Sequence, residues 1–72
     1  MKIRYDSEVD ALSIIFIEAT VTSVEIAEGI AVEYDAEGRV AGIEILDARS
    51  RFGPTDPFHS VTFEGLIPAA VG

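Results

Sequence analysis

Apolar and polar residues alternate along most of the chain, most clearly between residues 29 and 46. In the first part of this stretch Ile30, Val32 and Tyr34 occupy every second position. A period of two is typical of a β-strand with one apolar and one polar side. The pattern is interrupted at residues 35–38 (Asp-Ala-Glu-Gly), where Asp suits the first turn position and Gly the position that needs a positive φ. The pattern therefore predicts a β-hairpin with arms at 29–35 and 39–46.

The second arm of this hairpin breaks strict alternation. Val40 is out of phase with Ile43 and Ile45, and Gly42 lies between them. Glycine inside a strand is a natural position for a bulge, which shifts the phase by one residue. We therefore expect an irregularity in this strand at Gly42.

Four more segments are expected to be strands: three alternate with a period of two, and 11–17 is apolar on both faces. Their ranges are 2–6, 11–17, 22–27 and, as a short fifth or sixth strand, 60–64. Asp47 is instead a candidate cap for one helical turn that ends before Gly53-Pro54. The expected fold class is mainly β: a small antiparallel β-meander of four to six strands built on the 29–35/39–46 hairpin, with at most one short helical turn near 47–52.

A chain of 72 residues forms a single domain. The clearest break along it is the run 52–57, which holds two prolines and a glycine. We therefore expect a β unit over 1–51, followed over 52–72 by a linker, a short strand and an apolar tail.

The segment 11–17 is unusual because both of its faces are apolar. Leu12, Ile14 and Phe16 point to one side of the segment, whereas Ile15 and Ile17 point to the other. In a chain too short for two full layers, such a second face is expected at a contact between subunits. The expected interface residues are Ile15, Ile17, Phe63, Leu66 and Ile67.

Composition also favours self-association. Hydrophobic residues make up 49% of the chain and the mean hydropathy is +0.32, although a domain this small buries only a modest part of its surface. The sequence contains no cysteine, so disulfides and thiolate zinc sites cannot supply the missing stability. A homo-oligomer, most simply a homodimer, is therefore expected.

Thirteen acidic residues against five basic ones give a formal net charge of −8. This charge repels phosphate backbones and anionic lipid head groups, so we expect no nucleic-acid partner and no membrane binding. It is compatible with a basic protein partner and equally with plain solubility. The first residues resemble a strand rather than a signal peptide, and no stretch has membrane-spanning length, so the expected compartment is the cytoplasm.

Several runs of the sequence form a recognisable combination: Met1-Lys2-Ile3-Arg4-Tyr5-Asp6, Asp10-Ala11-Leu12, Gly29, Tyr34-Asp35, Gly38-Arg39-Val40 and Gly42-Ile43-Glu44-Ile45-Leu46-Asp47-Ala48. Together they resemble the domain-of-unknown-function family 2283, whose members are small bacterial and archaeal proteins. The likeness extends from residue 1 to about residue 51. It implies a fold unit without an assigned activity, catalytic residue or cofactor. Some relatives are suspected of acting beside small toxin-like proteins, and an antitoxin-like neutraliser is one form that binding to a basic protein partner could take.

The polar residues suggest three candidate sites, and a structural explanation suits each. Asp6, Glu8 and Asp10 have the spacing of the first three ligands of a calcium-binding loop, but the glycine and the closing glutamate of such a loop are missing. The hairpin also gathers the carboxylates Glu33, Asp35, Glu37 and Glu44, but alternation places Glu33, Asp35 and Glu44 toward water. His59 is the only histidine, so neither a zinc set nor a triad is completed.

No residue is therefore assigned a catalytic, cofactor-binding or metal-binding role, and no cofactor is expected. Two classes of function are compatible with the sequence. The first is a non-enzymatic protein-interaction module that acts as a homo-oligomer. The second is a small-ligand binder or enzyme whose site forms between subunits, where His59 could meet carboxylates of another chain.

Overall fold

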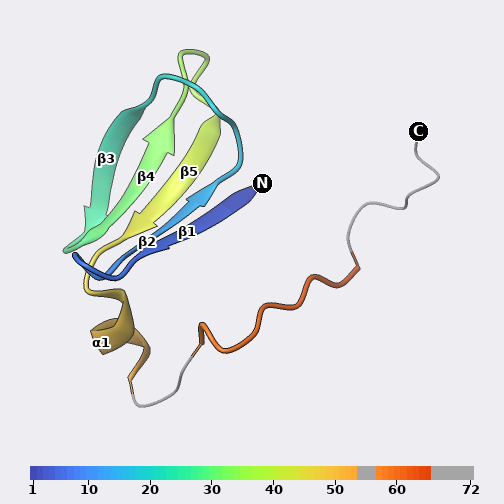
Figure 1. Cartoon of the computed structure of the whole chain (residues 1–72). Helices are drawn as coiled ribbons and strands as arrows, with labels where there is room; N and C mark the ends of the chain where they lie inside the picture. Colours follow the sequence, from blue (N-terminus) through green and yellow to red (C-terminus); the bar gives the residue numbers. More distant parts are fainter. Residues whose placement is uncertain (54–56, 66–72) are drawn as a thin grey trace.

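The computed structural model describes residues 1–53 and 57–65. These residues contain five strands and one short helix, so the fold is mainly β, as predicted (Figure 1). The elements are β1 (Lys2–Asp6), β2 (Ala11–Ile15), β3 (Thr22–Ala27), β4 (Ile30–Tyr34), β5 (Val40–Ile45) and α1 (Ala48–Phe52).

The strands form one antiparallel sheet with the order β1-β2-β5-β4-β3. Each strand pairs with the next one along the chain except β2, which is separated from β3 by β5 and β4. The link after β2 crosses to the opposite edge of the sheet, where β3 begins, and β4 and β5 then return toward β2 (Figure 1). β1 and β3 are therefore the two edge strands.

β2 ends at Ile15, two residues earlier than the alternation predicts. The amides of Phe16 and Ile17 both donate to the carbonyl of Ala41, at 2.7 and 3.0 Å. In a regular ladder consecutive amides point to opposite sides of the strand, so this shared acceptor marks the end of regular pairing.

The expected irregularity in β5 is confirmed. Glu33 pairs with Gly42 and Tyr34 with Val40, so Ala41 is the extra residue, next to Gly42. This shift brings Val40 and Ile43 into phase with β4 despite their odd spacing. A second shift lies in β3, where Ile26 is the unpaired residue.

The predicted helical turn is also confirmed, but the predicted cap is not. Asp47 occupies the N-cap position in the left-handed conformation, with φ 52° and ψ 43°, and its side chain makes no capping hydrogen bond. The amide of Ala48 instead donates to the carbonyl of Asp10 at 3.0 Å, which attaches α1 to the β1–β2 turn. The helix ends at Gly53, whose φ of 73° favours glycine.

Residues 60–64 form no strand, and the short strand predicted there is wrong. Alternation specifies which sides of a segment are apolar, but a strand also needs a neighbour with which to share backbone hydrogen bonds. No described strand pairs with this segment. The apolar tail predicted after it, including Leu66 and Ile67, lies outside the described residues.

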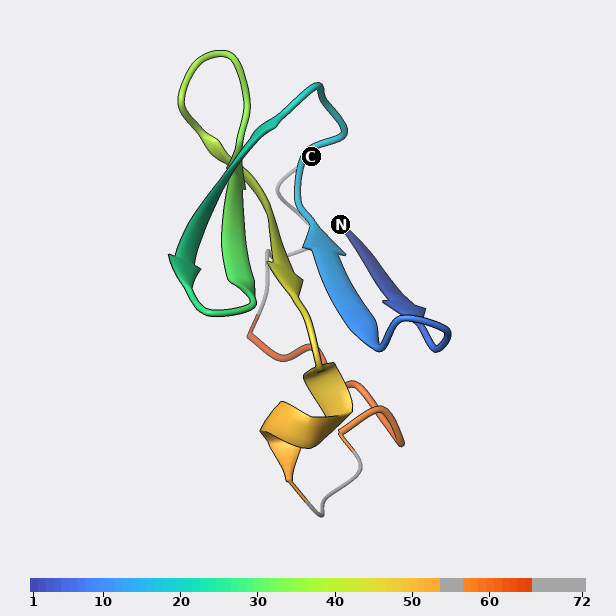
Figure 2. The ribbon, with the colours of Figure 1, turned by 90° about the vertical axis from the view of Figure 1, so that its left-hand side faces the viewer.

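The sheet has no second layer within the described residues, and α1 lies beyond one end of it (Figure 2). Among residues 1–53 and 57–65, only Ala11, Leu12, Ala41 and Ala48 are buried apolar residues, and no large side chain is completely buried. No helix in the described part of the chain is long and apolar enough to cross a membrane. The hydrophobic core of a single copy is therefore small and consists mainly of alanines.

Candidate interaction surface

The strand register gathers apolar side chains of all five strands on one face of the sheet. One row across the strands consists of Ile3, Ile14, Ile43, Val32 and Val24. The next row consists of Tyr5, Leu12, Ile45, Ile30 and Ala27. We call these ten residues the apolar face. It carries no charged group.

The opposite face, which we call the polar face, holds most of the charged residues of the strands. Its rows are Arg4, Ser13, Glu44, Ala31, Glu25 and Lys2, Ile15, Gly42, Glu33, Ser23. Among the paired strand residues of this face, the cations are confined to edge strand β1, which also carries Asp6, and the other carboxylates lie on β5, β4 and β3. Apart from Ala11, Ala31 and Ile15, the sheet therefore separates apolar from charged residues.

Much of the apolar face is accessible. Ile3 and Val24 are 41% and 47% exposed, and Ile14, Val32 and Ile43 are each half-buried, although they lie on the inner strands and at their centres. With about 4.8 Å between strands and about 3.3 Å per residue, the face measures on the order of 400 Å² in plan. Uncharged patches of this size on small proteins commonly mark interaction sites.

The interface residues predicted from the sequence are dispersed in the structure. Ile15 lies on the polar face, Ile15 and Ile17 are half-buried, and Phe63 is 54% exposed in the segment after α1. Leu66 and Ile67 lie outside the described residues. The larger apolar surface is on the other side of β2, with Leu12 and Ile14.

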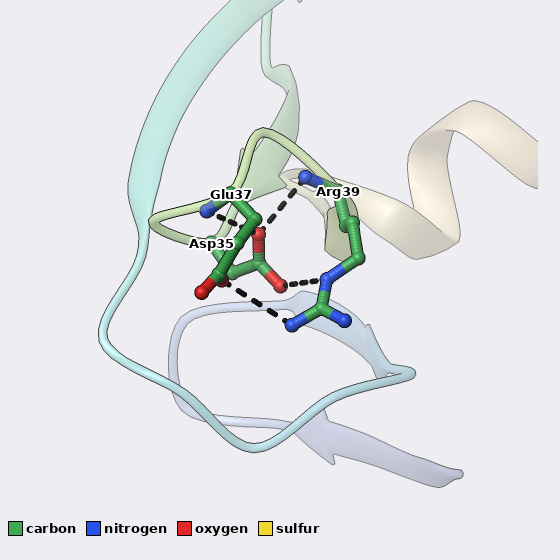
Figure 3. Close-up of polar contacts among 3 residues, drawn as sticks. All are labelled: Asp35, Glu37 and Arg39. Carbon is green, nitrogen blue, oxygen red and sulfur yellow. Dashed lines mark hydrogen bonds and ion pairs between the residues drawn. The ribbon is translucent and has the colours of Figure 1, made fainter.

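Asp35 is buried, contrary to the expectation that the hairpin carboxylates face water, and it organises the β4–β5 turn (Figure 3). Its Oδ1 accepts the amides of Glu37 and Arg39 at 3.0 and 2.9 Å, and its Oδ2 accepts Nε of Arg39 at 2.7 Å. The amide of Arg39 is the main cause that holds the pKa of Asp35 below its usual range. A carboxylate held in this way has a structural role in the turn.

The three carboxylates with calcium-like spacing do not converge. Asp6 accepts the amide of Glu8 at 2.9 Å, whereas Asp10 accepts the hydroxyl of Tyr5 at 2.6 Å and the amide of Arg49 at 3.1 Å. The Tyr5 hydrogen bond is the main cause that lowers the pKa of Asp10, and the same bond raises the pKa of Tyr5. Among residues 1–53 and 57–65, no three acidic or histidine side chains gather as a metal site would require.

A shallow hollow on the polar face does not involve the histidine. It is lined by Arg4, Asp6, Val9, Ala11, Ser13 and Glu44. His59 is exposed in the segment after α1 and is not part of this lining. Within a single copy, the described structure therefore does not bring His59 and the carboxylates of this hollow together.

The segment after α1 is attached to the sheet by aromatic contacts. The ring of Phe58 stacks on Tyr5 of β1 with centroids 4.4 Å apart, and meets Phe52 edge-on at 5.8 Å. The guanidinium of Arg49 lies 5.7 Å from the centre of the Phe58 ring. These contacts fix the start of the segment beside one end of the apolar face.

Comparison with known proteins gives a family but no activity. A family model described as a protein of unknown function, DUF2283, matches residues 2–49, which include all five strands. No match was found among curated proteins or among solved structures. The matched segment covers well over half of the chain, so the chain belongs to the DUF2283 family of proteins of unknown function.

Proposed function

We propose that this protein is a non-enzymatic interaction module that works as a homodimer, with the apolar face of one copy packed against the apolar face of another. The observation that carries the proposal is the uncharged face formed by all five strands, with no second layer over it among the described residues. Two such sheets pack about 10 Å apart in a β-sandwich, and their side chains then form a shared core.

A second copy suits this face better than a charged partner does. The face has no group with which a charge could pair, and desolvating an unpaired charge is costly. Two copies, each with a net charge of −8, can meet here because their charged strand residues lie on the outward polar faces. Because side chains protrude from the sheet, the accessible area of the apolar face is larger than its area in plan. It approaches the area of about 600 Å² per partner at which stable interfaces begin.

The dimer also accounts for the small core of one copy. A single sheet without a covering layer cannot keep its apolar side chains from water, and in the described part of the chain three of the four buried apolar residues are alanines. Pairing two sheets supplies the missing layer. The carboxylates of β3, β4 and β5 then lie on both outer surfaces, where they favour a basic protein partner over an acidic one.

The proposal is tested by placing the same charge on opposite faces of β4. Val32→Asp puts a carboxylate at the centre of the apolar face, whereas Ala31→Asp puts one on the polar face one residue earlier. Because a two-fold interface contains each substitution twice, we expect Val32→Asp to weaken dimerisation at least about a thousand-fold. Ala31→Asp is expected to leave the dimer intact. Sedimentation velocity at micromolar concentration measures both.

Val24→Asp provides a second variant on the apolar face, at a position already 47% exposed in a single copy, so loss of folding does not obscure the result. Circular dichroism checks that each variant retains its sheet. A wild-type chain that sediments as a monomer, or equal dissociation of the Val32→Asp and Ala31→Asp variants, would contradict the proposal.

A further inference from the structure

The segment after α1 keeps large apolar side chains in water. Phe58 anchors it to Tyr5 of β1, but further along Val61 is 60% and Phe63 54% exposed. Figure 1 shows this segment running away from the sheet, and no strand of its own copy pairs with it among the described residues. The segment thus begins at a fixed point and continues without a partner strand.

The same segment has the sequence of a strand. Val61, Thr62 and Phe63 are all residues favoured in strands, and in an extended chain Val61 and Phe63 share one side while Thr62 and Glu64 share the other. The segment lacks a neighbouring strand with which to share backbone hydrogen bonds. The sheet offers unpaired backbone groups at two places, on the outer sides of the edge strands β1 and β3.

Charge distinguishes the two edges. On the polar face β1 carries Lys2, Arg4 and Asp6. Lys2 forms an ion pair with Glu18 at 2.8 Å, whereas Arg4 has no ion pair with any residue that the structure describes. β3 carries Glu25 on that face. An added strand with Glu64 on the polar side therefore meets a strand with a net positive charge at β1 and a like charge at β3, and opposite charges across a strand pair are the favourable arrangement.

The apolar side of the segment also matches β1. With Glu64 on the polar face, Val61 and Phe63 lie beside Ile3 and Tyr5 and extend both rows of the apolar face by one strand. Ile3 is 41% exposed at present, so an added strand has apolar surface to cover.

We infer that residues 60–64 of one copy form a sixth strand on the β1 edge of a second copy, in a dimer that exchanges these arms reciprocally. The inference rests on the self-association proposed above, and adds which segment crosses and which edge receives it. It also explains why a segment with a strand pattern forms no strand in a single copy. Its partner strand belongs to another molecule.

Paramagnetic NMR tests the crossing without knowledge of the strand register. The chain has no cysteine, so Thr62→Cys accepts a single nitroxide label. Chains that carry the label, without isotopic enrichment, are unfolded and refolded together with ¹⁵N-labelled wild-type chains. We expect amide signals of Lys2–Asp6 in the ¹⁵N chains to lose intensity and those of Thr22–Ala27 to keep it. Reduction of the nitroxide is expected to restore every signal.

A charge reversal supplies the matched control. Glu64→Lys in the labelled chain places a cation against Lys2 and Arg4, and is expected to diminish the intensity loss on β1. Glu28→Lys makes the same charge change at an exposed position next to β3, and is expected to leave the loss unchanged. Equal effects of the two reversals would show net charge to be the cause, and would overturn the assignment of the edge.

Light scattering on the same samples separates failure of the inference from failure of the proposed function. A monomer with sharp β1 signals overturns both. A dimer with sharp β1 signals overturns the arm exchange and leaves the face-to-face pairing standing. Intensity loss that occurs only when label and ¹⁵N are on the same chain shows the arm docking on its own β1, and also overturns the exchange.

Discussion

Replacing Gly42 by alanine tests how closely β2 and β5 approach each other. Gly42 pairs with Ile15 on one side and with Glu33 on the other, on the polar face. A Cβ at this position would lie 2.8 Å from Oε1 of Glu33 and 2.9 Å from the carbonyl oxygen of Ile14. Both distances are shorter than a carbon and an oxygen tolerate without movement.

The two contacts differ in how easily they yield. The Glu33 carboxylate is at the end of a flexible side chain and can turn away, whereas the Ile14 carbonyl belongs to the backbone of a central strand. Overpacking of this kind costs about 1–3 kcal/mol. Removing a glycine from a strand regains about 0.5–1 kcal/mol of backbone entropy. We therefore expect Gly42→Ala to lower the free energy of unfolding by about 1–2 kcal/mol.

Urea denaturation followed by far-ultraviolet circular dichroism measures this change, with all variants at one protein concentration because a dimer's stability depends on it. The double variant Gly42→Ala/Glu33→Ala identifies which contact causes the loss. If the carbonyl is responsible, removing the carboxylate restores little of the stability. An unchanged or higher stability of Gly42→Ala, or full recovery in the double variant, would refute the close approach of the two strands.

Two further predictions concern the contacts that hold the turns and α1. Asp35 has a lowered pKa in the folded chain, so its contribution to stability is complete above the ordinary pKa of an aspartate and is lost as the pH falls through the lower folded value. Acid titration of unfolding should therefore show a loss below about pH 4 that is smaller in Asp35→Asn, where the lowered pKa of Asp10 still contributes, and is nearly retained in Gly38→Ala, in which the carboxylate is intact. Arg51 donates from Nε to the carbonyl of Leu46 at 2.6 Å and from its guanidinium to that of Glu28, so Arg51→Met should destabilise the chain by about 1 kcal/mol and speed amide exchange in α1. An unchanged free energy of unfolding in Arg51→Met would contradict a stabilising role of these two hydrogen bonds.

Local pattern was sufficient to locate most of the strands. The bounds predicted for Lys2–Asp6 and Thr22–Ala27 match β1 and β3, and the bulge beside Gly42 followed from the phase of Val40 alone. Each of these depends on side-chain alternation within one segment, which the sequence contains directly.

Features that depend on pairing between distant segments could not be predicted in the same way. The apolar face requires Leu12 beside Ile45 and Ile45 beside Ile30, and no single segment encodes that order. The strand predicted at 60–64 is wrong for the same reason, because alternation within a segment does not show whether another strand is available to pair with it. The alternation places Asp35 on the polar side of its strand and so predicts that it faces water. Its carboxylate is buried because the amides of the turn and the side chain of Arg39 donate hydrogen bonds to it.

The position of β5 in the sheet determines when the fold can be completed during synthesis. β1 and β2 leave the ribosome first, but β2 receives its second neighbour only when residues 42–45 have been made. Until then the hairpin of β1 and β2 has no neighbouring strand on the β2 side. Pairing between segments that are distant in the sequence is slow compared with closure of a local turn. Truncation before residue 42 should therefore release β1 and β2 from the β3–β4 hairpin, while a chain that ends just after α1 already contains every strand of the sheet.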